Sequence, residues 1–136
     1  MMFEIDQTYE EEFCISEKIY NGFIQLFRDK NPLHTDETFA ISKGFKSVVM
    51  HGNILNGFLS YFIGECLPTK NVIIHTQEIQ FKKPVYLNDR LYFNARVTGV
   101  FESVNAVEFK FEFSKLSELD KYQMAAKGKF QIGLLQ

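Results

Sequence analysis

Residues 53–66 read NILNGFLSYFIGEC, and their apolar members surround nearly the whole circumference of a helix. The stretch begins directly after Gly52, and its Ile, Leu, Phe and Tyr side chains recur at helical spacing. A helix without a continuous polar face is typical of the buried centre of a domain. The sequence therefore predicts a long buried helix over about 53–66, around which the other elements pack.

Four stretches of alternating apolar and polar residues follow this helix, at 72–81, 90–101, 104–113 and 122–134. Short connections between strands force antiparallel pairing, and an antiparallel sheet with one apolar face needs a cover. The predicted fold class is α+β, with a strongly bent antiparallel sheet wrapped around the central helix. We expect residues 1–136 to form a single domain.

The residues before the central helix predict two further helices. Residues 2–15 form an extended segment in which the alternation is poor. Ser16 is a suitable N-cap for a helix over 17–28, whose apolar residues recur at helical spacing. Thr35 or Asp36 can cap a second, shorter helix that ends near Gly44.

The composition excludes several classes of function. The net charge is −2, and Lys82–Lys83 is the densest basic pair, so no nucleic-acid partner is expected. Residues 54–67 are too short and too polar to span a bilayer, and the first residues lack the basic and apolar regions of a signal peptide. Cys14 and Cys66 do not make a disulfide framework. We expect a cytoplasmic protein with no membrane partner.

The most informative polar residues lie in the stretch RDKNPLHTD at 28–36. Asp29 and His34 flank Pro32, which ends the preceding helix, so both side chains can project into one space. A carboxylate beside an imidazole can position and polarise a water molecule. An aspartate at a helix end and a solvated turn histidine give the same spacing, so the pattern alone leaves both interpretations open.

A second polar stretch, VVMHGN at 48–53, leads into the central helix. Free backbone N–H groups at a helix N-terminus favour negative charge, and Gly52 lets a ligand approach the backbone closely. A developing oxyanion can be held at such a place. The alternative is that His51 caps the helix and Gly52 only relieves crowding.

Ser60 and His75 carry weaker signals. Ser60 lies on the central helix, nine residues after His51, where a hydroxyl can also bond to its own helix backbone. His75 shares a face with core residues in the alternating pattern and can simply be a buried histidine. The three histidines lack metal-ligand spacing and no nucleotide-binding motif is present, so neither a metal nor a cofactor is expected.

Together these stretches resemble the MaoC-like group of hot-dog-fold proteins, in particular the (R)-specific enoyl-CoA hydratases. The resemblance covers about residues 17–132 and rests on three blocks in the same order. They are the stretch from Asp29 to Phe45, the residues Val49-Met50-His51-Gly52 with the helix that follows, and the stretch FKKPVYLND at 81–89.

The resemblance implies a hydro-lyase that reversibly hydrates a trans-2-enoyl thioester to an (R)-3-hydroxyacyl thioester without a cofactor. It implies that Asp29 and His34 are the catalytic pair. His34 is the expected base towards water, while Asp29 orients that water and takes part in proton transfer to the α-carbon. The Gly52 amide is expected to hold the thioester oxygen, and the expected supporting residues for substrate binding are His51, Asn31 and Ser60.

The expected acyl pocket contains Phe58, Leu59, Phe62 and His75. Asn53 and Asn56-Gly57 depart from the family pattern of apolar residues, as does His75, and predict a shorter or more polar pocket. The thioester carrier can be CoA or an acyl carrier protein. The resemblance also implies a homodimer, because the edge strands of one copy are otherwise open.

Two alternatives stay open for the function. A hot-dog thioesterase usually has an acidic residue on or near the central helix, and here Glu65 lies only at its far end. A non-catalytic module that binds acyl thioesters has the same fold.

Overall fold

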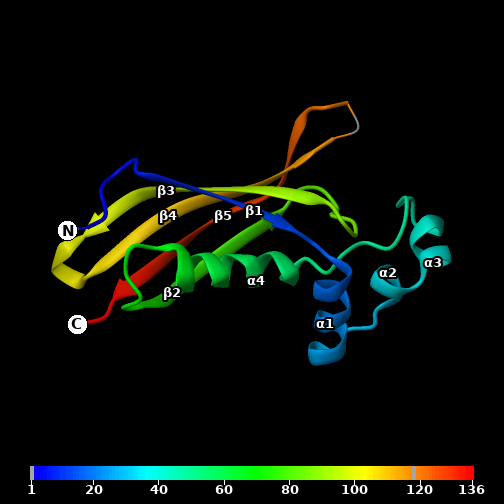
Figure 1. Ribbon diagram of the computed structural model, residues 1–136, viewed down its shortest axis with the longest axis horizontal. Helices are drawn as coiled ribbons and strands as arrows, with labels where there is room; N and C mark the ends of the chain where they lie inside the picture. Colours follow the sequence, from blue (N-terminus) through cyan, green and yellow to red (C-terminus); the bar gives the residue numbers. More distant parts are fainter. Residues whose placement is uncertain (1, 118) are drawn as a thin grey trace.

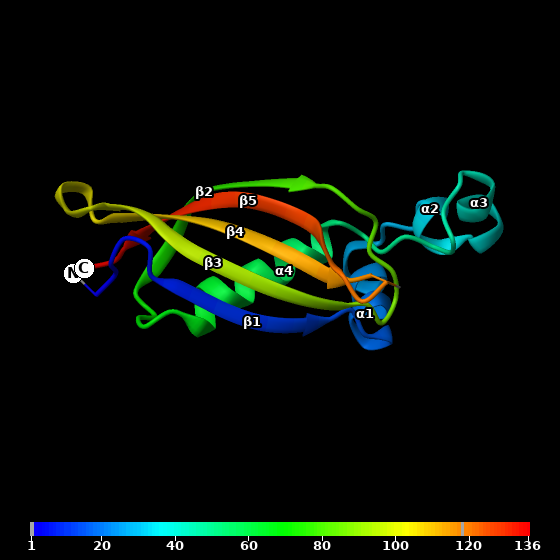
Figure 2. The same cartoon turned by 90° about the horizontal axis from the view of Figure 1, so that it is seen from above.

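The computed structural model describes residues 2–117 and 119–136. Within them a five-stranded antiparallel sheet curves over the helix α4, as Figures 1 and 2 show. This arrangement confirms the predicted hot-dog architecture. In chain order the elements are β1 (Thr8–Cys14), α1 (Glu17–Phe27), α2 (Pro32–Thr35), α3 (Glu37–Ser42), α4 (Asn53–Tyr61), a π-helical turn (Phe62–Cys66), β2 (Val72–Phe81), β3 (Arg90–Phe101), a 3-10 turn (Glu102–Val104), β4 (Ala106–Leu116) and β5 (Tyr122–Leu134).

The structure adds β1 to the four strands that the sequence predicts. β1 pairs antiparallel with β3 over residues 8–14 and forms one edge of the sheet, whose strand order is β1-β3-β4-β5-β2. Tyr9 and Phe13 pack against the core from this strand. Their alternation is hard to recognise in the sequence because Glu11 takes the position between them on the same side of the strand.

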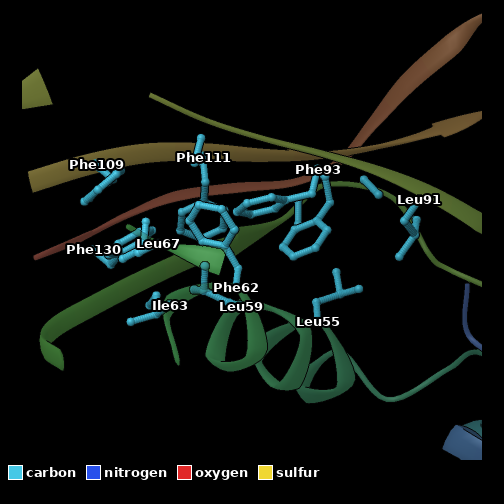
Figure 3. Packing of buried hydrophobic residues seen from close by; sticks show 14 of the residues in the cluster. Leu55, Leu59, Phe62, Ile63, Leu67, Leu91, Phe93, Phe109, Phe111 and Phe130 are labelled. Carbon is cyan, nitrogen blue, oxygen red and sulfur yellow. The ribbon is translucent and has the colours of Figure 1, made fainter. Parts of the chain in front are cut away.

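The central helix buries one face against the sheet. Figure 3 shows its side chains among the large apolar residues of the strands. The opposite face is open to solvent, so the prediction of a helix buried on most sides is wrong, because one sheet covers only one side of a helix. No helix among the described residues is long and apolar enough to cross a membrane. The buried side chains are Ile54, Leu55, Leu59, Phe62 and Ile63, and the exposed residues include Gly57, Ser60, Tyr61 and Gly64.

The edge strand β2 contains an irregularity at His75. The register with β5 shifts between Ile74 and Thr76, so the alternation changes face at this point. His75 is exposed, its Nδ1 accepts a hydrogen bond from the Gln131 side chain, and its ring lies against Gly133. The prediction that His75 shares a face with core residues is wrong, because the irregularity turns its side chain towards the outer face of the sheet.

The helices α2 and α3 stand beyond one end of the sheet, beside the start of α4 (Figures 1 and 2). The sequence predicts one short helix here, but Pro32 begins one helix and Asp36 caps a second. A hydrogen bond of 3.0 Å from the Val49 N–H to the Leu33 C=O ties the segment to the chain that enters α4. Residues near His34 are thereby fixed next to the N-terminus of α4.

Candidate active site

Asp29 lies in the turn that follows α1. The helix ends because Arg28 adopts a left-handed conformation with φ of 61°. The Asp29 Oδ1 accepts a hydrogen bond of 3.2 Å from the Asn31 N–H, while the Asn31 side chain accepts one of 2.9 Å from the Leu33 N–H and caps α2. The Asn31 side chain therefore builds the turn, and its backbone orients the Asp29 carboxylate.

The His34 ring has a defined tautomer. Its Nδ1 lies 2.7 Å from the Val49 carbonyl oxygen. Because a carbonyl only accepts, Nδ1 carries the hydrogen and Nε2 keeps a free lone pair, as a base requires. The Tyr20 hydroxyl donates to the His34 backbone carbonyl at 2.5 Å, and burial raises the pKa of Tyr20 and keeps it a donor. Contacts from α1 and from the segment before α4 thus fix His34.

His51 is buried beneath this pair, with 2% of its surface exposed. Its Nε2 donates to the Asp29 backbone carbonyl at 2.9 Å, so its side chain does not cap α4. Its ring lies between those of His34 and Phe23, with centroid distances of 4.0 and 4.6 Å. Burial lowers the pKa of His51 more than its hydrogen bond to the Asp29 backbone raises it, and the neighbouring His34 lowers it further. His51 is therefore a neutral positioning group that connects Asp29 to the start of α4.

The N-terminus of α4 presents free backbone donors. Among the described residues, the Gly52 and Asn53 N–H groups donate no hydrogen bond. The Phe81 ring lies against Gly52, because a Cβ atom at this position would be 2.9 Å from the Phe81 Cε1. Glycine at this position therefore lets an aromatic ring lie directly on the backbone that carries the donors.

Two hollows meet at Asp29. The first, the basic cleft, has a volume of about 510 Å³, and its lining includes His34, Gly52, Lys82 and Lys83. The second, the apolar groove, has a volume of about 1080 Å³ and runs between α1 and α4. Both volumes suit a small-molecule ligand. The apolar side chains that line the groove are Ile19, Phe23, Leu26, Phe27, Ile54 and Phe58, and the residues shared by both hollows are Phe23, Asp29 and Asn53.

The structure brings together Asp29, His34, His51 and Gly52, but separates other predicted site residues from them. Leu59 and Phe62 point into the core between helix and sheet, as Figure 3 shows, and line neither hollow. Only Phe58 of the expected acyl-pocket residues lines the apolar groove. The side chains outside both hollows also include those of Asn31, Ser60 and His75.

Sequence reasoning missed Tyr20, Phe23 and Phe81 as residues of this site. Tyr20 and Phe23 belong to the apolar stripe of α1 and resemble core residues in the sequence. The hydroxyl of Tyr20 on that stripe was a usable signal, because a buried tyrosine hydroxyl usually has a hydrogen-bond partner.

Asp29, His34 and His51 also have potential metal-ligand atoms within 4.8 Å of one another. The rings of His34 and His51 are stacked at an angle of 27°, so their lone pairs do not converge on one point. In addition, one nitrogen of each ring already donates to a backbone carbonyl. The geometry therefore suits a hydrogen-bonded acid–base group better than a metal centre.

Comparisons with known proteins agree with the fold described above and with the resemblance seen in the sequence. The family model described as the MaoC like domain matches residues 3–115. The chain belongs to the MaoC-like family. This MaoC-like protein is 34% identical over 96 residues to an (R)-specific enoyl-CoA hydratase of Rhodospirillum rubrum, a match that covers 71% of the chain and 67% of the relative.

Two further similarities concern Aeromonas caviae. Its (R)-specific enoyl-CoA hydratase is 36% identical over 81 residues, which are 60% of each protein. The solved structure described as the (R)-hydratase from A. caviae involved in PHA biosynthesis superposes on the MaoC-like protein with a TM-score of 0.85 and 26% identity, covering 98% of both chains. The sequence matches thus span roughly 60–67% of these curated relatives, whereas the structural match spans nearly the whole chain.

Proposed function

We propose that this MaoC-like protein reversibly adds water to the double bond of a trans-2-enoyl thioester and forms an (R)-3-hydroxyacyl thioester. The observation that carries the proposal is the arrangement of three groups in the basic cleft. There the Asp29 carboxylate, the free Nε2 of His34 and the unpaired N–H of Gly52 line one cleft. The curated relatives, named as (R)-specific enoyl-CoA hydratases, support this chemistry and make the chain a hydro-lyase.

In the proposed reaction, His34 Nε2 accepts a proton from a water molecule that Asp29 orients. The water oxygen forms a bond to the β-carbon, and the α-carbon receives a proton through Asp29. The proton that His34 takes from water passes to the Asp29 carboxylate, since ligand atoms of the two side chains lie within 4.8 Å of each other, and Asp29 then gives it to the α-carbon. Both side chains therefore end in their starting protonation states. An acid–base group of this kind typically contributes about 10²–10⁴-fold to the rate.

The start of α4 supports the second part of the reaction. Addition of hydroxide to the β-carbon places negative charge on the thioester oxygen. The Gly52 N–H and the positive end of the α4 dipole can stabilise that charge. A preorganised donor of this type is worth about 3–4 kcal/mol of the activation barrier.

Replacement of Gly52 by alanine tests this geometry. Gly52 has φ of −57° and ψ of −34°, which alanine adopts without strain, so the thermal midpoint should change little. The added Cβ is too close to the Phe81 ring, which lines the cleft and must move, and we expect kcat/KM for crotonyl-CoA to fall about 10–100-fold.

The matched control for this prediction is the same substitution in a Phe81→Ala protein. There the added methyl group meets no ring, so its effect on kcat/KM should shrink to about twofold or less. Equal losses in the two backgrounds would contradict the proposed contact between residue 52 and Phe81.

Two asparagines add polar groups to the apolar groove, which is the proposed acyl side of the site. Asn53 and Asn56 line the apolar groove. The Asn56 Nδ2 donates to Asn53 Oδ1 at 2.9 Å, and the Gln77 Nε2 donates to Asn56 Oδ1 at 2.6 Å. Burial of a long alkyl chain against these amides desolvates them without replacing their hydrogen bonds to water. We therefore infer a short acyl group, for which crotonyl thioesters are suitable probes.

The thioesterase alternative is less compatible with the structure. Glu65 is exposed, forms an ion pair of 2.6 Å with Lys70, and lies about 18 Å along the helix from the start of α4. Product analysis distinguishes the alternatives. Chiral chromatography should find (R)-3-hydroxybutyryl-CoA from crotonyl-CoA without release of free thiol. Free thiol would indicate a thioesterase, and bound but unchanged substrate would indicate a non-catalytic module.

We also propose that the protein is a homodimer that pairs through β2. Ile74 and Phe81 lie opposite the buried residues Ile132 and Ala126, yet they are 39% and 51% exposed. An open edge strand with exposed apolar residues favours pairing with a second copy. Light scattering should give twice the chain mass of 15.9 kDa, and a mass near that of one chain would contradict this proposal.

A further inference from the structure

The charged side chains that line the basic cleft are two lysines and one aspartate. Among the residues that the structure describes, Lys82 and Lys83 are the only lysine or arginine residues that line it, and Asp29 is the only carboxylate. Both lysines are exposed, and neither has a carboxylate within 4.0 Å among the residues that the structure describes. Their backbone N–H groups both donate to the Ala125 carbonyl, at 2.7 and 3.1 Å. The backbone is therefore fixed, while two unpaired ammonium groups are presented at the cleft.

The other two hollows differ from this cleft in charge. The hollow on the outer face of the sheet, of about 780 Å³, is lined by Glu10, Glu11, Glu12 and Glu112 and by no lysine or arginine. The apolar groove holds one lysine, Lys18, and the shared Asp29, among mostly apolar side chains. Of these three, only the basic cleft has a charge that attracts an anion.

We propose that Lys82 and Lys83 bind a phosphate group of the thiol carrier. The carrier arm then enters through the basic cleft, the thioester lies at Asp29, and the acyl group extends into the apolar groove. This inference rests on the proposed function. The reverse orientation is less favourable, because the apolar groove offers a phosphate group one lysine, Lys18, beside Asp29 and mostly apolar side chains. Lysine suits the task because its ammonium group is a compact charge on a flexible stem.

Two carriers share the required chemistry. CoA and an acyl carrier protein both hold the acyl group on a pantetheine arm that ends in a phosphate. CoA has two further phosphates, one that completes its diphosphate and one on its ribose. The test therefore compares crotonyl esters of CoA, dephospho-CoA, 4′-phosphopantetheine and pantetheine. The last has the reacting group but no phosphate.

The variant for this test is Lys82→Gln/Lys83→Gln, which removes both charges and keeps most of each side-chain stem. We expect its kcat/KM for crotonyl-CoA to fall at least about tenfold, and that for crotonyl-pantetheine to stay within about twofold of the wild-type value. The matched control is Lys110→Gln/Lys127→Gln, which removes two exposed lysines from β4 and β5 and should change neither value.

The outcomes separate the three phosphate positions of CoA. A loss with CoA and dephospho-CoA that is absent with the phosphopantetheine ester assigns the lysines to the second phosphate of the CoA diphosphate and identifies CoA as the carrier. A loss that persists with the phosphopantetheine ester assigns the lysines to the phosphate next to pantetheine, which both carriers have. A loss seen with CoA but absent with dephospho-CoA assigns them to the ribose phosphate and identifies CoA as the carrier. Equal losses for the CoA and pantetheine esters, or no loss for CoA, would overturn the inference.

Failure of the proposed function gives a different result. In that case the wild-type protein hydrates neither ester, whatever the state of the lysines. Titration calorimetry with CoA alone then still tests the lysine pair, which should strengthen binding at least about tenfold over the double variant.

Discussion

Replacement of His34 by alanine is expected to lower kcat for crotonyl-CoA hydration by about 10²–10⁴-fold. The substitution removes the ring nitrogen that accepts the proton of water in the proposed mechanism. Its structural cost should be small, because the half-buried ring makes one hydrogen bond, to Val49, worth about 1 kcal/mol. Circular dichroism and a thermal scan check the fold, and initial rates of crotonyl-CoA hydration measure the loss.

Two matched variants sharpen this prediction. His75→Ala also removes a histidine ring, but from the outer face of the sheet, and should leave kcat unchanged. Asp29→Asn keeps the shape of the side chain and an oxygen that can accept from the Asn31 N–H, but it removes the carboxylate. If Asp29 and His34 act on one water molecule, the double variant should be hardly slower than the slower single variant. Fully multiplicative losses would contradict a shared role.

Replacement of Phe62 by alanine should have the largest effect on stability. The ring has no exposed surface, and its centroid lies 4.7 Å from that of Phe93 and 5.8 Å from that of Tyr9. Removal of such a ring leaves a cavity and typically costs about 3–5 kcal/mol. This is a large part of the roughly 5–15 kcal/mol by which a domain is stable. Urea denaturation of the variant and the wild-type protein measures the difference.

The neighbouring Tyr61 provides the control for Phe62. Its side chain is 52% exposed on the open face of the same helix, so Tyr61→Ala should cost about 1 kcal/mol or less. The pair also tests the acyl-pocket assignment made from the sequence. If Phe62→Ala changed the preferred acyl length but barely changed stability, Phe62 would be a pocket residue and its placement in the core would be wrong.

Much of the fold could be predicted from the sequence because apolar residues recur at a regular spacing in most helices and strands. The helix over 17–28 and the three strands that follow residue 89 correspond to regular patterns. The pattern failed where local features interrupt it. In β1, the charged residue Glu11 interrupts the apolar positions of the inner face, so the alternation is hard to recognise. In β2, the irregularity at His75 changes which side chains point to the inner face of the sheet. The open face of α4 was also missed, because an apolar pattern does not show how many neighbours cover it.

Only the local part of the site could be predicted from the sequence. Pro32 between Asp29 and His34 indicates a turn that brings two nearby residues together. The contacts that hold them come from distant segments and depend on the complete fold. Tyr20 binds the backbone of His34 across 14 positions, and His51 binds that of Asp29 across 22. The spacing of residues within one short stretch cannot predict these two hydrogen bonds.

The most direct test of the proposed hydratase is the absorbance of the conjugated enoyl thioester. Purified protein is mixed with crotonyl-CoA, and the absorbance is followed for the wild type and for His34→Ala side by side. The wild-type protein is expected to remove the absorbance until the hydration equilibrium is reached, and the variant to do so at least about 100-fold more slowly. A folded wild-type protein that leaves the absorbance unchanged, or a variant that matches its rate, would contradict the proposed function.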